Sequence, residues 1–421
     1  MSESHSRGPL AIEPMPTPLL AFRNMAGVIG ALSLALLALT ALIPHERQMV
    51  TRSMLFGFHF WLAPTLGGMA FVMISHCTGG GWGVIYRRFG EALFVNLLWM
   101  LPVCLVMIVL GHTLLFPWAH LESFRLSDPE AYEVMYKRVP WYTWNWFLIR
   151  QLAYFAIWGA LAFALRTGSL RLDEAENPVL RRRLRKISAA GIVLFFVTVT
   201  SYAMDYILSR ETNWYSSIIG FISAIEFGLS GVSIGTLTVC YFAKRKPLRD
   251  VLSPQHLNDL GNLLLALVIL WMYTSFSQFL IQWNGNLKDD IGYYVHRGMG
   301  EHPNGWRFVA LGLFLGHFLV PFFLLLMKGL KRKAITLGAV CVWIFIMRIV
   351  ESLWVIAPSN THRTSDPGLV YWTDIFAFLG VGGIWVFLYL RTLGTEPMLP
   401  QNATHQPEPI SHGTHAHAHA V

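Results

Sequence analysis

Arg348 and Glu351 are the residues of this sequence whose surroundings point most clearly to chemistry. They lie inside residues 334–358, AITLGAVCVWIFIMRIVESLWVIAP, which are otherwise almost entirely apolar. As a helix, this segment is long enough to cross a bilayer core of about 30 Å. A spacing of three residues places both charges on one helix face, where they can pair.

A lone charge at membrane depth costs at least about 2.5–3.5 kcal/mol. We therefore predict that Arg348 and Glu351 pair inside a helical bundle with a polar interior. Two interpretations follow. The pair belongs to a proton or ligand site, as ionisable residues inside membrane spans usually do, or it only fixes the rotation and register of its helix.

A third ionisable residue, Glu226, lies near the middle of another apolar segment. It shares a helix face with Ser223, Ser230 and Ser233, because the four are spaced by three, four and three residues. Serine hydroxyls both donate and accept hydrogen bonds, so such a stripe can pass a proton or hold a water chain. We predict that Glu226 exchanges protons; the alternative is a neutral carboxyl that bonds a neighbouring helix.

Four more candidates for a proton relay or a quinol pocket lie in apolar segments: His59, Asp205, His317 and Asp374. For the two histidines the alternative is a hydrogen bond between helices, and for the two aspartates it is a place at the membrane interface. By segment position, Glu226, His317 and Arg348 fall near mid-membrane. The other four candidates fall in the outer half, which predicts a half-channel opening toward the outer face.

Composition excludes a soluble protein. Of 421 residues, 54% are hydrophobic and only 13% are charged, whereas soluble domains are about 25% charged. We predict an all-α, polytopic integral membrane protein. The net charge of +8 fits basic loops on one membrane face, and no basic patch with interleaved aromatic residues suggests nucleic acid.

Ten apolar segments have the length of membrane spans. They are approximately 25–43, 53–77, 91–115, 145–166, 187–208, 214–241, 258–281, 306–328, 334–356 and 370–391. We expect a membrane domain over 23–391, between a disordered tail at 1–22 and a His- and Pro-rich disordered tail at 392–421. Loops on the side of the N-terminus carry 20 Lys and Arg against 10 on the other side. Both termini are therefore expected in the cytoplasm.

The sequence lacks the usual motifs for a redox cofactor or a metal. Its four cysteines, Cys77, Cys104, Cys240 and Cys341, form no C-x-x-C pair and no C-x-x-C-H haem site. No H-E-x-x-H motif is present. We expect the chain to bind no haem, iron–sulfur cluster or metal through its own side chains.

One segment carries a family resemblance. SHCTGGGWGVIYRRFGEAL (75–93) resembles the His-x-Thr-Gly-Gly-x-Trp-Gly … Arg-Arg … Glu-Ala segment of the ActF family, the NrfD-like membrane subunits of bacterial alternative complex III. Four further blocks are similar, at 205–220, 257–287, 316–332 and 346–354. Together they cover most of residues 50–360.

The resemblance implies a multi-pass subunit of the bacterial inner membrane, with spans two to five and six to nine in two four-helix bundles and two flanking helices. It implies partners in a quinol:cytochrome c, or other electron-acceptor, oxidoreductase: an NrfD-like sister subunit and periplasmic subunits that carry haem c and iron–sulfur clusters. It further implies a role in quinol oxidation or coupled proton translocation, with menaquinone or ubiquinone as the quinone.

We thus expect a non-catalytic chain that acts within a respiratory complex. Two other functions remain open from the residues alone. Ionisable groups at mid-membrane also suit a secondary transporter, although clearly interrupted helices in matching halves are missing from the pattern. The third possibility is a structural membrane anchor for peripheral haem and iron–sulfur subunits.

Overall fold

The computed structural model describes residues 14–175, 177–212, 214–300, 303–358 and 370–400. In this part of the chain ten helical segments are long and apolar enough to cross a membrane, as predicted. They are α1 (Thr17–Thr40), α2 (Arg47–Thr78), α3 with α4 (Gly81–Leu115), α7 (Trp144–Glu174), α8 continued to Arg210 (Pro178–Arg210), α9 (Ile219–Phe242), α11 (Pro254–Gly285), α13 to α14 (Trp306–Leu326), α16 (Ala334–Ile356) and α17 (Trp372–Thr395).

The first span begins earlier than the sequence predicted. Helix α1 starts at Thr17, because Pro18 suits the first turn, where its missing N–H costs no helical hydrogen bond. The last part of the expected 1–22 tail is therefore helical, and residues 1–13 lie outside the described residues. At the other end α17 continues to Thr395, and the tail from residue 401 again lies outside the described residues.

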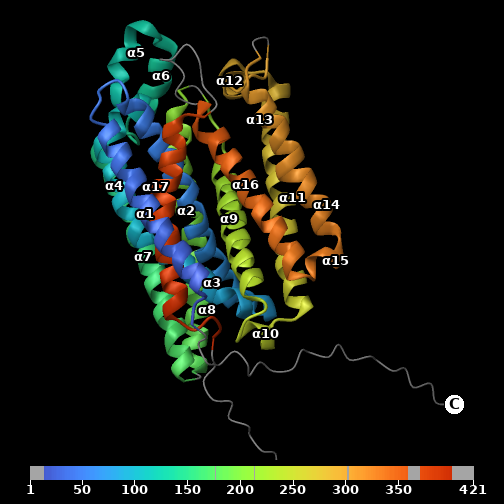
Figure 1. The fold of residues 1–421 in the computed structure, drawn as a ribbon. Helices are drawn as coiled ribbons and strands as arrows, with labels where there is room; N and C mark the ends of the chain where they lie inside the picture. The colour runs from blue at the N-terminus through green and yellow to red at the C-terminus, as the bar shows by residue number, and fades with distance from the viewer. Residues whose placement is uncertain (1–13, 176, 213, 301–302, 359–369, 401–421) are drawn as a thin grey trace, which may run out of the picture.

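The long connection after α4 is helical as well. It contains α5 (Leu121–Ser127) and α6 (Pro129–Arg138), and the Asp128 carboxylate accepts a hydrogen bond of 3.0 Å from the Ala131 N–H at the start of α6. With α12 (Lys288–His296), these short helices lie at one end of the bundle (Figure 1). We call this end the opposite face, and the end at which α1 begins and α17 ends the terminal face.

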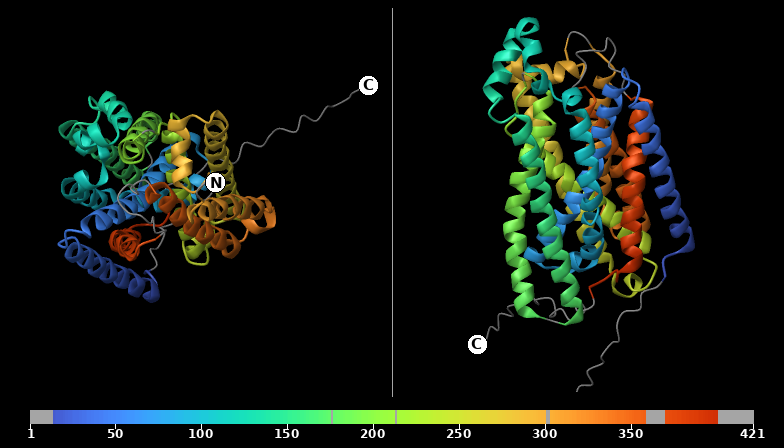
Figure 2. Two further views of the ribbon diagram at one scale, coloured as in Figure 1. Left: turned by 90° about the horizontal axis from the view of Figure 1, so that it is seen from above. Right: turned by 90° about the vertical axis from the view of Figure 1, so that its left-hand side faces the viewer.

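The first and tenth spans lie side by side at the edge of the bundle (Figure 2). Their backbones touch at two glycines. A Cβ atom on Gly30 would lie 2.8 Å from the Ile384 nitrogen, and one on Gly383 would lie 2.4 Å from the Ala26 carbonyl oxygen. Small residues at such a crossing let helices in a membrane gain close van der Waals contact.

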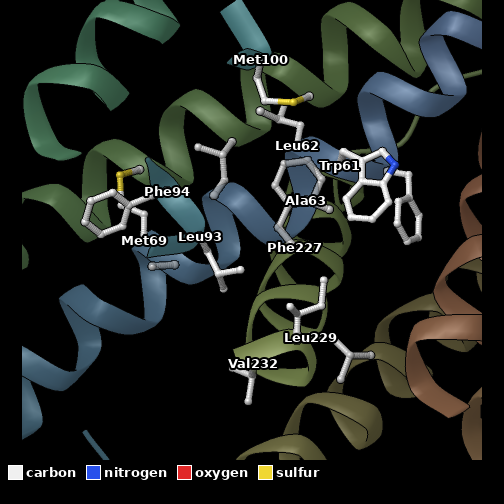
Figure 3. Packing of buried hydrophobic residues seen from close by; sticks show 14 of the residues in the cluster. Trp61, Leu62, Ala63, Met69, Leu93, Phe94, Met100, Phe227, Leu229 and Val232 are labelled. Carbon is white, nitrogen blue, oxygen red and sulfur yellow. The ribbon is translucent and has the colours of Figure 1, made fainter. Parts of the chain in front are cut away.

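Helices α2 and α9 form the centre of the bundle. The apolar window of α2 is enclosed by other helices along its whole length. The two helices are in backbone contact, because a Cβ atom on Gly67 would lie 1.7 Å from the Phe227 carbonyl oxygen. Around this crossing, buried side chains of α2, α3 and α9 pack together (Figure 3), among them Leu62, Met69, Leu93, Phe94, Phe227 and Leu229.

We expect Gly67→Ala to destabilise the protein by about 1–3 kcal/mol, the usual cost of overpacking a tight core. The added methyl group would meet the α9 backbone, which cannot rotate away. The measurement is thermal unfolding of the purified protein in detergent.

Gly159→Ala is the matched control, since a Cβ atom at this position of α7 meets no atom within 4 Å. It should leave stability unchanged or raise it slightly, by the helix propensity of alanine. Equal melting temperatures for the two variants would contradict the close α2–α9 crossing.

Candidate functional site

Four of the seven candidate residues come together in the bundle interior. They are Glu226 on α9, His317 in the π-helical segment η3 (Leu313–Leu319), and Arg348 and Glu351 on α16, and all four are buried. Glu351 Oε2 is in direct contact with Arg348 Nη1, which confirms the predicted pair. Arg348 Nη2 lies 3.8 Å from Glu226 Oε2, and His317 Nδ1 lies 3.2 Å from Glu351 Oε2. We call these four residues the acid–base cluster.

The serine stripe on α9 contributes one residue that positions this cluster. Arg348 Nε donates a hydrogen bond of 3.0 Å to Ser230 Oγ. The same hydroxyl donates to the backbone carbonyl oxygen of Glu226, at 2.9 Å. Ser230 therefore holds the guanidinium one helical turn from the Glu226 backbone, so that Arg348 faces a carboxylate from each of two helices.

The π-helical segment lies directly before a proline. Pro321 has no N–H to donate to the carbonyl of His317, four residues earlier, so one hydrogen bond of a regular α-helix is missing at this point. The carbonyl oxygen of the neighbouring Gly316 accepts a hydrogen bond of 2.7 Å from Trp343 Nε1 on α16. The eighth span is thereby irregular where His317 meets α16, and π-helical turns occur frequently at functional sites.

Trp271 on α11 completes the cluster, and sequence reasoning missed it. Its Nε1 donates a hydrogen bond to Glu351 Oε1, and its ring centroid lies 4.2 Å from that of His317. A signal was present: Trp271, Gln278 and Gln282 are spaced by seven and four residues and share the buried face of α11.

The charges of the cluster do not balance when both carboxyls and the guanidinium are ionised and the His317 imidazole is neutral. Two carboxylates face one guanidinium, and burying an unpaired charge is strongly unfavourable. In addition, Glu226 Oε2 and His317 Nε2 are buried without a hydrogen-bond partner. A proton shared among the carboxyls and the imidazole would balance the charge, so the arrangement can hold and exchange a proton.

A cavity of about 430 Å³ adjoins the cluster. Glu226, Glu351 and Trp271 line it, and the other walls are mainly apolar and aromatic residues of α11, α13 and α16. Tyr293 and Tyr294 of α12 line it as well, so the cavity extends from the cluster toward the opposite face. Its volume lies within the range of sites that bind small molecules, about 300–1,000 Å³.

His59 lies close to the cluster but has a different partner. Its Nδ1 is 3.0 Å from the Tyr202 hydroxyl, and its ring centroid lies 5.8 Å from that of Phe227, the residue after Glu226. Its Nε2 is buried without a hydrogen-bond partner. The structure thus places His59 beside α9, and no direct contact joins it to the acid–base cluster.

Asp205 lies apart from the cluster, in an ion pair with Arg150 of α7. Arg150 donates two hydrogen bonds to its carboxylate, of 2.6 and 3.1 Å. Gln151 Nε2 and the Tyr154 hydroxyl each add one of 3.0 Å. Four donors to one carboxylate are typical of a rigid structural link.

Asp374 is also paired, at the first turn of α17. Its carboxylate accepts hydrogen bonds of 2.6 Å from Arg52 Nη2 and 2.6 Å from Ser53 Oγ, both on α2. It further accepts a hydrogen bond of 2.9 Å from the backbone N–H of Tyr371, which stabilises the start of the helix. Asp374 therefore links the second span to the tenth.

No group of three or more His, Cys, Asp or Glu suited to hold a metal ion occurs within the described ranges. All four cysteines are free. No protein-family model matches the sequence, and no curated protein shows significant similarity to it. The resemblance to NrfD-like subunits therefore stays a prediction.

Proposed function

We propose that this chain is an integral membrane subunit of a respiratory quinol:cytochrome c, or other electron-acceptor, oxidoreductase complex. The observation that carries the proposal is the acid–base cluster at the end of the 430 Å³ cavity. Oxidation of a quinol releases two protons and two electrons. A site for it needs buried groups that accept protons and an apolar enclosure for the ring.

The cavity has the chemistry that a quinol headgroup requires. Its aromatic walls suit a flat ring. Glu226 and Glu351 line it. The buried Oε2 of Glu226 lacks a hydrogen-bond partner, so it can accept a hydrogen bond from a quinol hydroxyl. Menaquinone and ubiquinone share these hydroxyls, so the geometry suits either.

In the proposed reaction, the carboxylates of Glu226 and Glu351 accept the two quinol protons one after the other. Arg348 stabilises them while they are ionised, and His317 beside Glu351 passes protons onward. The two electrons leave to a haem c or iron–sulfur group on a partner subunit. The chain therefore acts with periplasmic redox subunits and an NrfD-like sister subunit, and has no catalytic activity alone.

The contacts between spans also suit the arrangement that we propose for the bundle. Helix α2 packs on α3, α4 and α8, and α9 packs on α11 and α16 as well as on α8 and α3. Spans two to five and six to nine would then form two four-helix bundles that meet along α9, which contacts α2, α3 and α8. We place the protein in the bacterial inner membrane with its terminal face toward the cytoplasm, because the loops of that face carry most of the Lys and Arg residues.

The test is Glu226→Gln in the intact complex. Glutamine keeps the shape and the hydrogen bonding of glutamate but cannot take up a proton. We expect normal assembly and a fall in quinol turnover of about 10²-fold, the contribution of one positioned acid–base group. Turnover and proton release are measured with a soluble quinol and the complex in liposomes.

Glu133→Gln is the control, since this glutamate of α6 is exposed and far from the cluster. Full quinol turnover and full proton release in Glu226→Gln would contradict the proposal and favour a structural anchor. A chain that purifies without redox partners and moves a solute across liposomes would instead be a secondary transporter.

A further inference from the structure

A second cavity, of about 630 Å³, lies outside the acid–base cluster. It is a groove between α1, α2 and α4 on the flank of the bundle, and its floor is closed where Gly111 of α4 meets Thr51 of α2. Leu110 and Val106 on its rim are 75% and 55% exposed. Around a membrane span, such an opening faces lipid.

The walls of this groove suit a hydrocarbon chain. They consist almost entirely of apolar side chains from the three helices. On α4 the groove extends from Trp99 to Leu114, which is about 22 Å of helix at 1.5 Å per residue. One leaflet of the bilayer core is about 15 Å deep, so an acyl chain fits along the groove.

The charged end of the groove is at the opposite face. Arg47, the first residue of α2, lines it there and is exposed. Its Nε donates a hydrogen bond of 2.9 Å to the Ala41 carbonyl oxygen, which directs the guanidinium toward α1. Within the described part of the chain no carboxylate forms an ion pair with Arg47. Oε1 of the neighbouring Glu46 lies 3.3 Å from His45 Nε2.

We infer that this groove is a binding site for an anionic phospholipid, with one acyl chain between α1 and α4 and the headgroup phosphate on Arg47. A guanidinium matches a phosphate in charge and in geometry, whereas a quinone headgroup carries no charge. A transmembrane helix from a partner is too large, since 20 residues at about 10 Å width fill about 2,400 Å³, against 630 Å³ for the groove.

Native mass spectrometry of the full-length protein tests the site with two probes, phosphatidylglycerol and phosphatidylcholine of identical acyl chains. We expect one phosphatidylglycerol to bind about fivefold more tightly than one phosphatidylcholine, because one Arg near a membrane surface contributes about 1 kcal/mol to the binding of an anionic lipid. Arg47→Gln should abolish this preference. Ala38→Trp should abolish binding of both lipids, because Ala38 is exposed on α1 and lines the groove.

Two variants serve as matched controls. Ala35→Trp places the same side chain on α1 at an exposed residue that does not line the groove, and Arg125→Gln removes an exposed arginine from α5. Both should bind lipid like the wild type. Should Ala38→Trp fail to fold, Val106→Trp fills the groove from its opposite wall.

Three results would overturn the assignment. They are equal affinity of the wild type for the two lipids, a preference that survives Arg47→Gln, and a co-purified quinone in the wild type that is lost from the groove-filling variants. This site does not depend on the proposed function. Lipid binding is measured without turnover, so either proposal can fail while the other holds.

Discussion

Replacing Arg348 by Met is expected to destabilise the folded protein by about 3–5 kcal/mol. The change leaves the carboxylates of Glu226 and Glu351 buried without their cation, and breaking a buried ion pair from one side carries about this cost. Unfolding in detergent, followed by temperature or denaturant, measures the loss.

The double variant Arg348→Met with Glu351→Gln is the informative comparison. It removes both partners of the closest pair, so it should be less destabilising than the sum of the two single changes. Additive losses would show that the two side chains do not interact in the folded protein, contrary to their contact in the structure.

Asp205→Asn is expected to have an effect of similar size, about 3–5 kcal/mol, because it leaves the Arg150 guanidinium buried and uncompensated. The amide group also cannot accept all four hydrogen bonds that the carboxylate receives. Thermal unfolding measures this effect, with Asp250→Asn as the control, since Asp250 is exposed on α10 (Leu248–Val251).

This variant also separates the structural role from the proton relay that the sequence suggested for Asp205. With a structural role, quinol turnover per folded molecule stays at the wild-type value. Wild-type stability together with lost proton release would instead assign Asp205 to the relay.

Local sequence patterns were sufficient to predict the membrane spans and one contact of the site. Long apolar segments predicted ten spans, because hydrophobic length alone decides whether a helix can cross a bilayer. The Arg348–Glu351 pair was predictable because its partners lie one turn apart on one helix.

The partners of Asp205 and Asp374 were not predictable in the same way. Arg150 and Arg52 lie 55 and 322 residues away in the sequence. Spacing along one helix says nothing about which helices become neighbours. Arg52 also lies near the start of α2, before the predicted second span (53–77), so by sequence position it counts as a loop residue on the side opposite the termini.

The irregular eighth span was likewise missed, although its sequence contains Pro321 within the apolar segment. A proline predicts that a helix is disturbed, but the form of the disturbance depends on what satisfies the free carbonyls. Here Trp343 of another helix donates a hydrogen bond to the carbonyl oxygen of Gly316, next to His317, and that contact exists only in the folded protein.

The ion pair between Arg52 and Asp374 can form only late in the synthesis of the chain. Asp374 is made 322 residues after Arg52, a delay of about 15–60 s at ribosomal rates of about 5–20 residues per second. Arg150, in contrast, can pair with Asp205 as soon as the consecutive helices α7 and α8 are made. Arg52 remains without its carboxylate until the tenth span is inserted, and α1 lacks its main packing surface for the same time. A chain that ends before α17 therefore leaves Arg52 without its carboxylate and α1 without its main packing partner, so the two outer spans can join the bundle only together.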